Sequence, residues 1–161
     1  MALVIDPEAA AYGFFQIAFA TMDTRLSRSL VAVCQCKSAN FALASISRMP
    51  FGLRLAQLRK AIKAVESDLP NDSDIQELKT GCDLAESVQR WRNSRIHADV
   101  RFAGPCPVLV DRDGKPLQID REECEQKIRE AIRAGIAMEA HVRPLVAFLQ
   151  DIEALEDSDT Y

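Results

Sequence analysis

Apolar side chains recur at steps of three and four residues along most of the chain, which is the spacing of one face of an α-helix. The first such stretch covers about 7–36, and it opens with Asp6, Pro7 and Glu8, residue types that favour a helix start. Its expected apolar face consists of Phe14, Ile17, Ala18, Met22, Leu26, Leu30 and Val33. The pattern therefore predicts a long amphipathic first helix.

Further stretches with the same spacing are separated by helix-breaking residues. A helix is expected from about Asn40, and Pro50 must end or kink it. The next runs to about Glu66, a loop follows at 68–73, and Ser73 with Gln76 forms a capping-box pattern for another helix. A last helix is expected after Asp120 and Glu123, with a kink at Pro144 and an apolar face that includes Ile128, Ile132, Ile136, Val142, Val146 and Leu149.

One segment before the last helix has a different pattern. Gly104-Pro105-Cys106-Pro107 predicts irregular backbone, and 108–110 and 117–119, joined through Asp113-Gly114, are typical of a short β-hairpin. The fold class expected is all-α: a helical bundle of four to five helices with a small β-hairpin inserted before the last long helix. We expect a single domain over 1–161, with an acidic, frayed tail at 150–161.

Composition narrows the class of protein. The chain has 161 residues, 48% of them hydrophobic, but no apolar run near the roughly 18 residues that span a bilayer, so no membrane partner is expected. The first residues lack the basic region of a signal peptide, and a cytoplasmic location is the expectation. Five cysteines without paired spacing predict reduced core thiols rather than disulfides or a metal site.

Charge is distributed unevenly around a net value of −4. Residues 90–101 contain Arg90, Arg92, Arg95 and Arg101 against Asp99 alone. A compact basic site on an otherwise acidic protein suits a small phosphate-bearing target or a short stretch of RNA better than a long duplex.

The end of the helix expected at 73–97 carries the candidate chemistry. At about 100° per residue, Arg92 and Asn93 fall within about 60° of the centre of its apolar arc, where polar side chains are unusual. Asn93 and His97 are four residues apart and would share a helix face. Histidine exchanges a proton near neutral pH, and arginine supplies a permanent fork of donors for phosphate.

Structural explanations remain for the same residues. Arg92 could pair with a core carboxylate such as Asp83 or Glu86 and only hold helices together. His97 could be a cation that favours the end of a helix dipole. Trp91 lies off the main apolar arc, so it could pack on a neighbouring helix, cover a dimer surface or stack on a base.

The segment Arg92-Asn93-x-x-x-His97 resembles the signature of the HEPN (higher eukaryotes and prokaryotes nucleotide-binding) family, and the order of expected helices resembles that family over nearly the whole chain. The resemblance implies a metal-independent endoribonuclease, or a non-catalytic relative, often in toxin-antitoxin, phage-defence or stress systems. It also implies dimers in which two motifs face one cleft. One toxin branch has Tyr two residues after the His, where this chain has Asp99.

This interpretation assigns a role to each motif residue. His97 would be the general base or acid, Arg92 would bind the phosphate, and Asn93 would orient either of them, without a metal or cofactor. Arg90, Arg95 and Arg101 would contact the RNA backbone. Because each chain offers one motif histidine, a two-fold homodimer is expected, burying part of the helix at 7–36 or 73–97 near Trp91. The alternative is a HEPN-like helical binding or scaffold protein without turnover.

Overall fold

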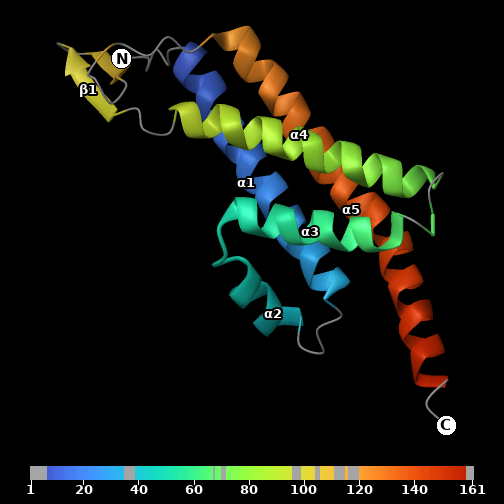
Figure 1. Cartoon of the computed structure of the whole chain (residues 1–161). Coiled ribbons are helices and arrows are strands. Elements are labelled where there is room, and N and C mark those ends of the chain that lie inside the picture. Colours follow the sequence, from blue (N-terminus) through green and yellow to red (C-terminus); the bar gives the residue numbers. More distant parts are fainter. Residues whose placement is uncertain are drawn as a thin grey trace.

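The fold is a helical bundle, described here by a computed structural model (Figure 1). The structure describes residues 7–34, 39–66, 68–69, 72–95, 99–103, 106–110, 115 and 120–158. Five helices lie in these ranges, namely α1 (Pro7–Val33), α2 (Ala39–Ile46), α3 (Phe51–Glu66), α4 (Ser73–Arg95) and α5 (Arg121–Ser158). The predicted all-α class is confirmed.

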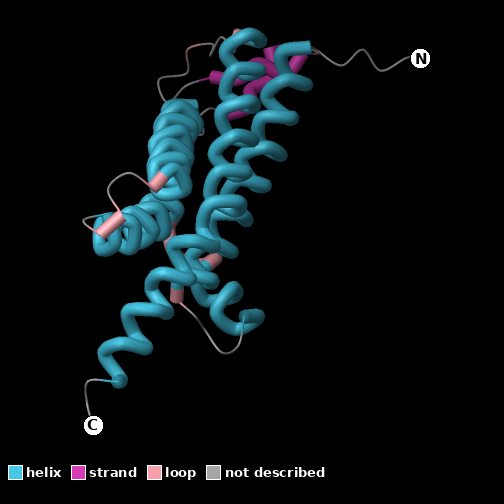
Figure 2. The backbone as a smooth tube through the Cα atoms, turned by 90° about the vertical axis from the view of Figure 1, so that its right-hand side faces the viewer, coloured by secondary structure: helices cyan, strands magenta, loops and turns pink. Residues whose placement is uncertain are grey.

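Helix α5 is the centre of the bundle, because α1 and α4 both pack along it (Figures 1 and 2). Two glycines permit this close approach. A Cβ on Gly81 of α4 would lie 2.8 Å from the Cβ of Ala137, and one on Gly135 of α5 would lie 3.4 Å from the Cα of Met22 in α1. Helix α3 crosses the bundle and contacts both α1 and α4.

The helix starts follow the expected capping chemistry, with one correction. Asp120 caps α5, since its Oδ1 accepts a hydrogen bond from the backbone N of Glu122 at 2.9 Å. Helix α4 is capped by Asp72 rather than by the predicted Ser73, because the Asp72 carboxylate accepts the backbone N–H of Ile75 at 3.0 Å. Asp6, the predicted cap of α1, lies outside the described residues.

The hairpin predicted between 108–110 and 117–119 is not shown, and 116–119 lie outside the described residues. Strand β2 (Cys106–Val110) instead pairs antiparallel with the preceding strand β1 (Asp99–Ala103). The two residues between these strands in the sequence, Gly104 and Pro105, lie outside the described residues. Pro107 pairs with Phe102, which a two-stranded sheet tolerates because both strands are edges.

Several apolar residues that the sequence pattern predicted to be in the core are exposed. Four side chains assigned to the apolar faces of the first and last helices are more than 45% exposed, namely Phe14, Ile17, Ile132 and Ile136. Their places in the core are taken by Phe15 and Phe19 on α1 and by smaller residues such as Ala131 and Ala134 on α5. Each of these helices therefore has a second apolar face that is exposed in the described part of the structure.

Candidate functional site

The end of α4 is held against α1 by an aromatic cluster, which we define as Tyr12, Phe15, Phe19, Phe51 and Trp91. Trp91 is only 7% exposed, and its ring meets Phe15 edge-on with centroids 4.6 Å apart. Of the three interpretations open for Trp91, packing on a neighbouring helix is confirmed. A buried indole cannot also cover a dimer surface or stack on a base.

The buried face of α4 rotates along the helix, which explains a wrong expectation for Asn93. From Cys82 onward the buried residues are Ala85, Val88 and Trp91, always three apart. Each step of three falls about 60° short of a full turn, so the buried arc has moved away from its earlier centre by the last turn. Asn93 is consequently exposed rather than inside the apolar arc, while Arg92 remains half-buried.

Arg92 is held by an aromatic ring rather than by a carboxylate. Its guanidinium carbon lies 4.4 Å from the ring centroid of Phe19. Its Nε is buried and has no hydrogen-bond partner among the described residues. Within the described ranges, no carboxylate pairs with it, and the predicted alternatives are already engaged. Asp83 and Glu86 instead bind the guanidinium of Arg59 at 2.6 and 2.8 Å.

The other partly buried arginines in the described ranges each hold a carboxylate. Arg25 pairs with Glu139 at 3.2 Å, and Arg54 pairs with Asp23 at 2.6 Å. Arg59 has its two partners on α4, and Arg95 pairs with Glu123 at 2.7 Å. Arg92 differs from all four, because its charge is desolvated on one side and has no anion among the described residues.

The flanking arginines are less available than the sequence suggests. Arg95 lies over the Trp91 ring, 4.2 Å from its centroid, in addition to its ion pair with Glu123 on α5. Arg90 is exposed and pairs with Glu86 one turn earlier. The local positive charge expected at 90–101 is therefore partly neutralised within the chain.

His97 and the side chain of Arg101 lie outside the described residues. Helix α4 ends at Arg95, two residues before His97 in sequence. The sharing of one helix face by Asn93 and His97 therefore stays a prediction.

Away from the end of α4, His141 and two buried cysteines have structural positions. His141 on α5 lies 2.5 Å from Asp74, from its Nδ1 to the carboxylate Oδ1, and so links α5 to the first turn of α4. Burial raises the pKa of the Cys82 thiol to about 12 and also raises the pKa of Cys124. The predicted core position is confirmed for these two cysteines, whereas Cys34 is exposed. Neither buried thiol would be a nucleophile at neutral pH.

Arg54, which is 4% exposed on α3, was not among the residues singled out from the sequence. A signal was present, because Arg54 lies four and eight residues before Leu58 and Ile62, both buried on the same row of the helix. Its guanidinium donates to the Ser27 hydroxyl and pairs with Asp23, both on α1. This ion pair fixes α3 against α1 one turn from Phe51, whose ring lies 5.4 Å from that of Phe19.

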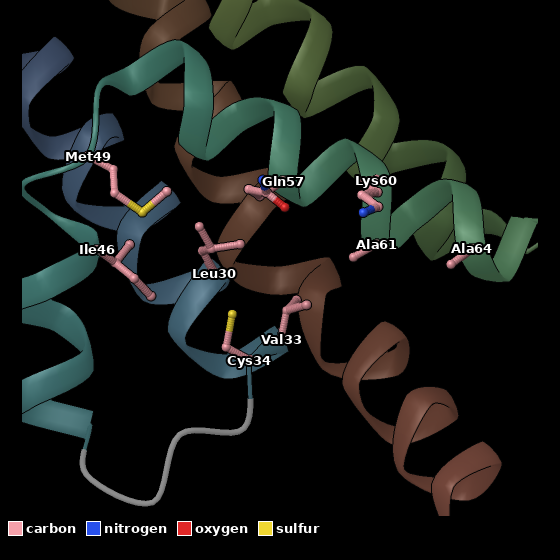
Figure 3. Close-up of a pocket in the computed structure, with 9 residues that line it drawn as sticks. All are labelled: Leu30, Val33, Cys34, Ile46, Met49, Gln57, Lys60, Ala61 and Ala64. Atoms are coloured by element: carbon pink, nitrogen blue, oxygen red, sulfur yellow. The ribbon is translucent and has the colours of Figure 1, made fainter. Parts of the chain in front are cut away.

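An apolar cavity of about 490 Å³ lies where α2 and α3 meet the end of α1 (Figure 3). Its walls include Leu30, Ile46 and Met49, and the polar side chains of Gln57 and Lys60 lie on the α3 side. None of the arginines at 90–95 lines this cavity. It is thus separate from the candidate site around Arg92.

Comparisons of the chain with protein-family models, with curated proteins and with solved structures found no match. Among the described residues, no helix is long and apolar enough to cross a lipid bilayer. The case for a function therefore depends on the residues themselves.

Proposed function

We propose that this protein is a metal-independent endoribonuclease of the HEPN type, which cleaves single-stranded RNA. The proposal rests on the sequence Arg92-Asn93-x-x-x-His97 and on one structural observation. Arg92 is half-buried on an aromatic ring and, among the described residues, has no carboxylate partner.

A guanidinium in this state favours an anionic ligand. An arginine that only links helices gains most from a carboxylate, as Arg25, Arg54, Arg59 and Arg95 do here. The Phe19 ring limits the directions open to Arg92 and removes water from one face of its charge. A phosphate bound by Arg92 would receive the charge-assisted hydrogen bonds that the described part of the chain leaves unused.

The proposed reaction is a transesterification that releases the downstream RNA fragment with a 5′-hydroxyl end. His97 of one chain takes the proton of the ribose 2′-OH, and the 2′-oxygen attacks phosphorus. The P–O bond to the 5′-oxygen breaks, and a second histidine protonates that oxygen, leaving a 2′,3′-cyclic phosphate. Arg92 stabilises the additional negative charge of the phosphorane, and the exposed Asn93 amide orients the phosphate or His97.

The partners follow from this chemistry. A two-fold homodimer would supply the second histidine, since each chain has one motif histidine. Arg101, together with the exposed Arg90, would guide the RNA backbone. The family resemblance adds a role in toxin-antitoxin, phage-defence or stress responses, with an antitoxin or defence partner, in the cytoplasm.

A second candidate is a non-catalytic HEPN-like binding or scaffold protein. The ion pairs of Arg90 with Glu86 and of Arg95 with Glu123 favour it, because they reduce the charge left for RNA. In that case, Arg92 would anchor α4 on α1 and nothing more.

Matched variants separate the two candidates. His97→Ala removes a general acid or base and should reduce RNA cleavage in EDTA by about 10²- to 10⁴-fold. Arg92→Ala removes the phosphate-binding group and should abolish cleavage. Arg28→Ala, an exposed arginine on α1, and His141→Ala should leave the cleavage rate unchanged. Cleavage that survives His97→Ala would reject the nuclease assignment. Inactive wild-type protein, with Arg92→Ala unfolding at lower temperature, would favour the scaffold.

A further inference from the structure

The outer side of α5 carries a regular stripe of six residues. They follow one another at steps of four, three, four, three and four residues, the heptad spacing of helices that pack side by side. The stripe consists of Glu125, Arg129, Ile132, Ile136, Glu139 and Arg143. Ile132 and Ile136 at its centre are 49% and 52% exposed.

The stripe is complementary to itself when reversed. Ile132 and Ile136 lie two residues on either side of Ala134, and Arg129 and Glu139 lie five residues on either side. Glu125 and Arg143 lie nine residues on either side of the same point. A second α5 laid antiparallel about the level of Ala134 would therefore place every arginine of the stripe opposite a glutamate, and every isoleucine opposite an isoleucine. A parallel arrangement would oppose like charges instead.

The apolar centre of the stripe continues onto α1. Phe14 and Ile17 are 64% and 65% exposed on the helix that packs beside α5. Ile132 lines a small cavity together with Ala18 and Thr21 of α1, so the apolar surfaces of the two helices adjoin. Exposed apolar patches of this kind, bordered by charges, mark sites of protein association.

We propose that this face binds a second copy of the same chain, with the two-fold axis crossing the stripe at the level of Ala134. The four isoleucines of two copies would form the centre of the interface, with Phe14 and Ile17 beside them. Four intermolecular ion pairs would fix the register. The surface is assigned from exposure and charge order alone, and does not depend on RNA cleavage. Arg95 at the end of α4 pairs with Glu123, eleven residues before Ala134, so this antiparallel arrangement would hold the two Arg92 sites roughly 30 Å apart along α5. It is therefore a contact separate from the one that would bring a second histidine to the site.

The dimer surface expected from the sequence is a different one and stays a prediction. That surface was placed near Trp91, but Trp91 is buried against Phe15 within one chain. The face proposed for the second copy shares the first helix with it, through Phe14 and Ile17, and uses α5 rather than the helix at 73–97.

Charge reversal tests the register directly. With Arg129→Glu, a glutamate would face Glu139 of the other copy at each of the two symmetric positions. With Glu139→Arg, an arginine would likewise face Arg129 at each of them. In sedimentation experiments, each variant should weaken the dimer by roughly 10- to 100-fold relative to wild type. The double variant Arg129→Glu/Glu139→Arg should restore it. An equimolar mixture of the two single variants should form a heterodimer, because the two reversed charges then face each other and every ion pair across the interface again joins opposite signs.

Arg28→Glu, on the exposed side of α1 and outside the stripe, is the control for added charge and should leave the dimer intact. Thermal unfolding of each variant separates loss of association from loss of folding, because Glu139 also pairs with Arg25. Wild-type protein that stays monomeric at high micromolar concentration would overturn the proposal. A dimer that Ile136→Asp abolishes but that neither the double variant nor the mixture restores would overturn the antiparallel register. RNA cleavage that depends on His97, by a protein that shows no dimer in sedimentation, would remove this interface and the second histidine, but would keep the nuclease assignment.

Discussion

The ion pair between Arg54 and Asp23 should respond very differently to loss of either partner. Arg54 is 4% exposed, whereas the side chain of Asp23 is 33% exposed. Asp23→Ala would leave a guanidinium without its counter-charge inside the protein. Arg54→Met would leave a carboxylate that water can still reach, and would keep most of the packing of the arginine stem.

The expected magnitudes follow from these exposures. Breaking a buried pair so that a charge stays unpaired costs about 3–5 kcal/mol, and we expect Asp23→Ala to lie near the lower end of this range. For Arg54→Met we expect a cost of about 1–2 kcal/mol, mainly for the unmet Ser27 and Asp23 acceptors. For a chain of this size, each kcal/mol corresponds to a Tm shift of about 2–4 °C.

Thermal and urea unfolding of the two single variants and the double variant provide the assay. The double variant Asp23→Ala/Arg54→Met should be more stable than Asp23→Ala alone, because it removes the unpaired guanidinium. If Arg54→Met costs as much as Asp23→Ala, or if the two costs add, the reasoning from burial is wrong.

Three further predictions concern packing and ionisation. Gly81→Ala should lower the free energy of unfolding in urea titrations by about 1–3 kcal/mol, because its Cβ would lie 2.8 Å from that of Ala137. Gly13→Ala, whose Cβ would have nothing within 4 Å, should raise the free energy of unfolding by about 0.5–1 kcal/mol. Cys82, whose thiol pKa burial raises to about 12, should react with iodoacetamide at neutral pH only as the protein unfolds, as mass spectrometry can follow. Hydrogen bonds from Arg90 and Arg59 lower the pKa of Glu86, so its contribution to stability is present at neutral pH and is lost as the pH falls through that lowered value. Arg90→Ala should raise the Glu86 pKa in an NMR titration, and an unchanged titration would contradict this.

Much of the fold could be predicted because it depends on local patterns. The helix boundaries followed apolar periodicity and a few strong residues, such as Asp120 at the start of α5 and Pro50 before α3. The hairpin was expected around Asp113-Gly114, a strong turn signal, and the described residues do not show it there. The described residues instead pair β2 with β1, the strand that directly precedes it in the sequence.

The candidate site was predicted in part, for a physical reason that concerns helix geometry. A fixed apolar arc placed both Arg92 and Asn93 inside, but the buried face of α4 rotates as it follows Cys82, Ala85, Val88 and Trp91. Arg92 stays near the edge of that face and meets Phe19, while Asn93 turns outward. The contact between Arg92 and Phe19 joins residues far apart in sequence, and periodicity within one helix carries no information about it.

The exposed isoleucines of α5 illustrate the same limit. Ile132 and Ile136 continue a helical apolar pattern, so the sequence assigned them to the core of one chain. The packing of α1 and α4 on the small residues of α5 leaves them outside. Apolar periodicity shows that a helix has an apolar face. Whether that face packs inside the same chain or stays exposed depends on the tertiary arrangement.

The central claim is that the Arg92 site cleaves RNA through the ribose 2′-OH without a metal. It is tested most directly by incubating the purified protein in EDTA with a single-stranded RNA and with the 2′-deoxy strand of the same sequence, and by determining the mass of the product ends. We predict cleavage of the RNA alone, with 2′,3′-cyclic phosphate ends, lost in His97→Ala and Arg92→Ala. Cleavage of the 2′-deoxy strand, 3′-hydroxyl ends, or no cleavage by wild-type protein in excess over RNA would contradict it.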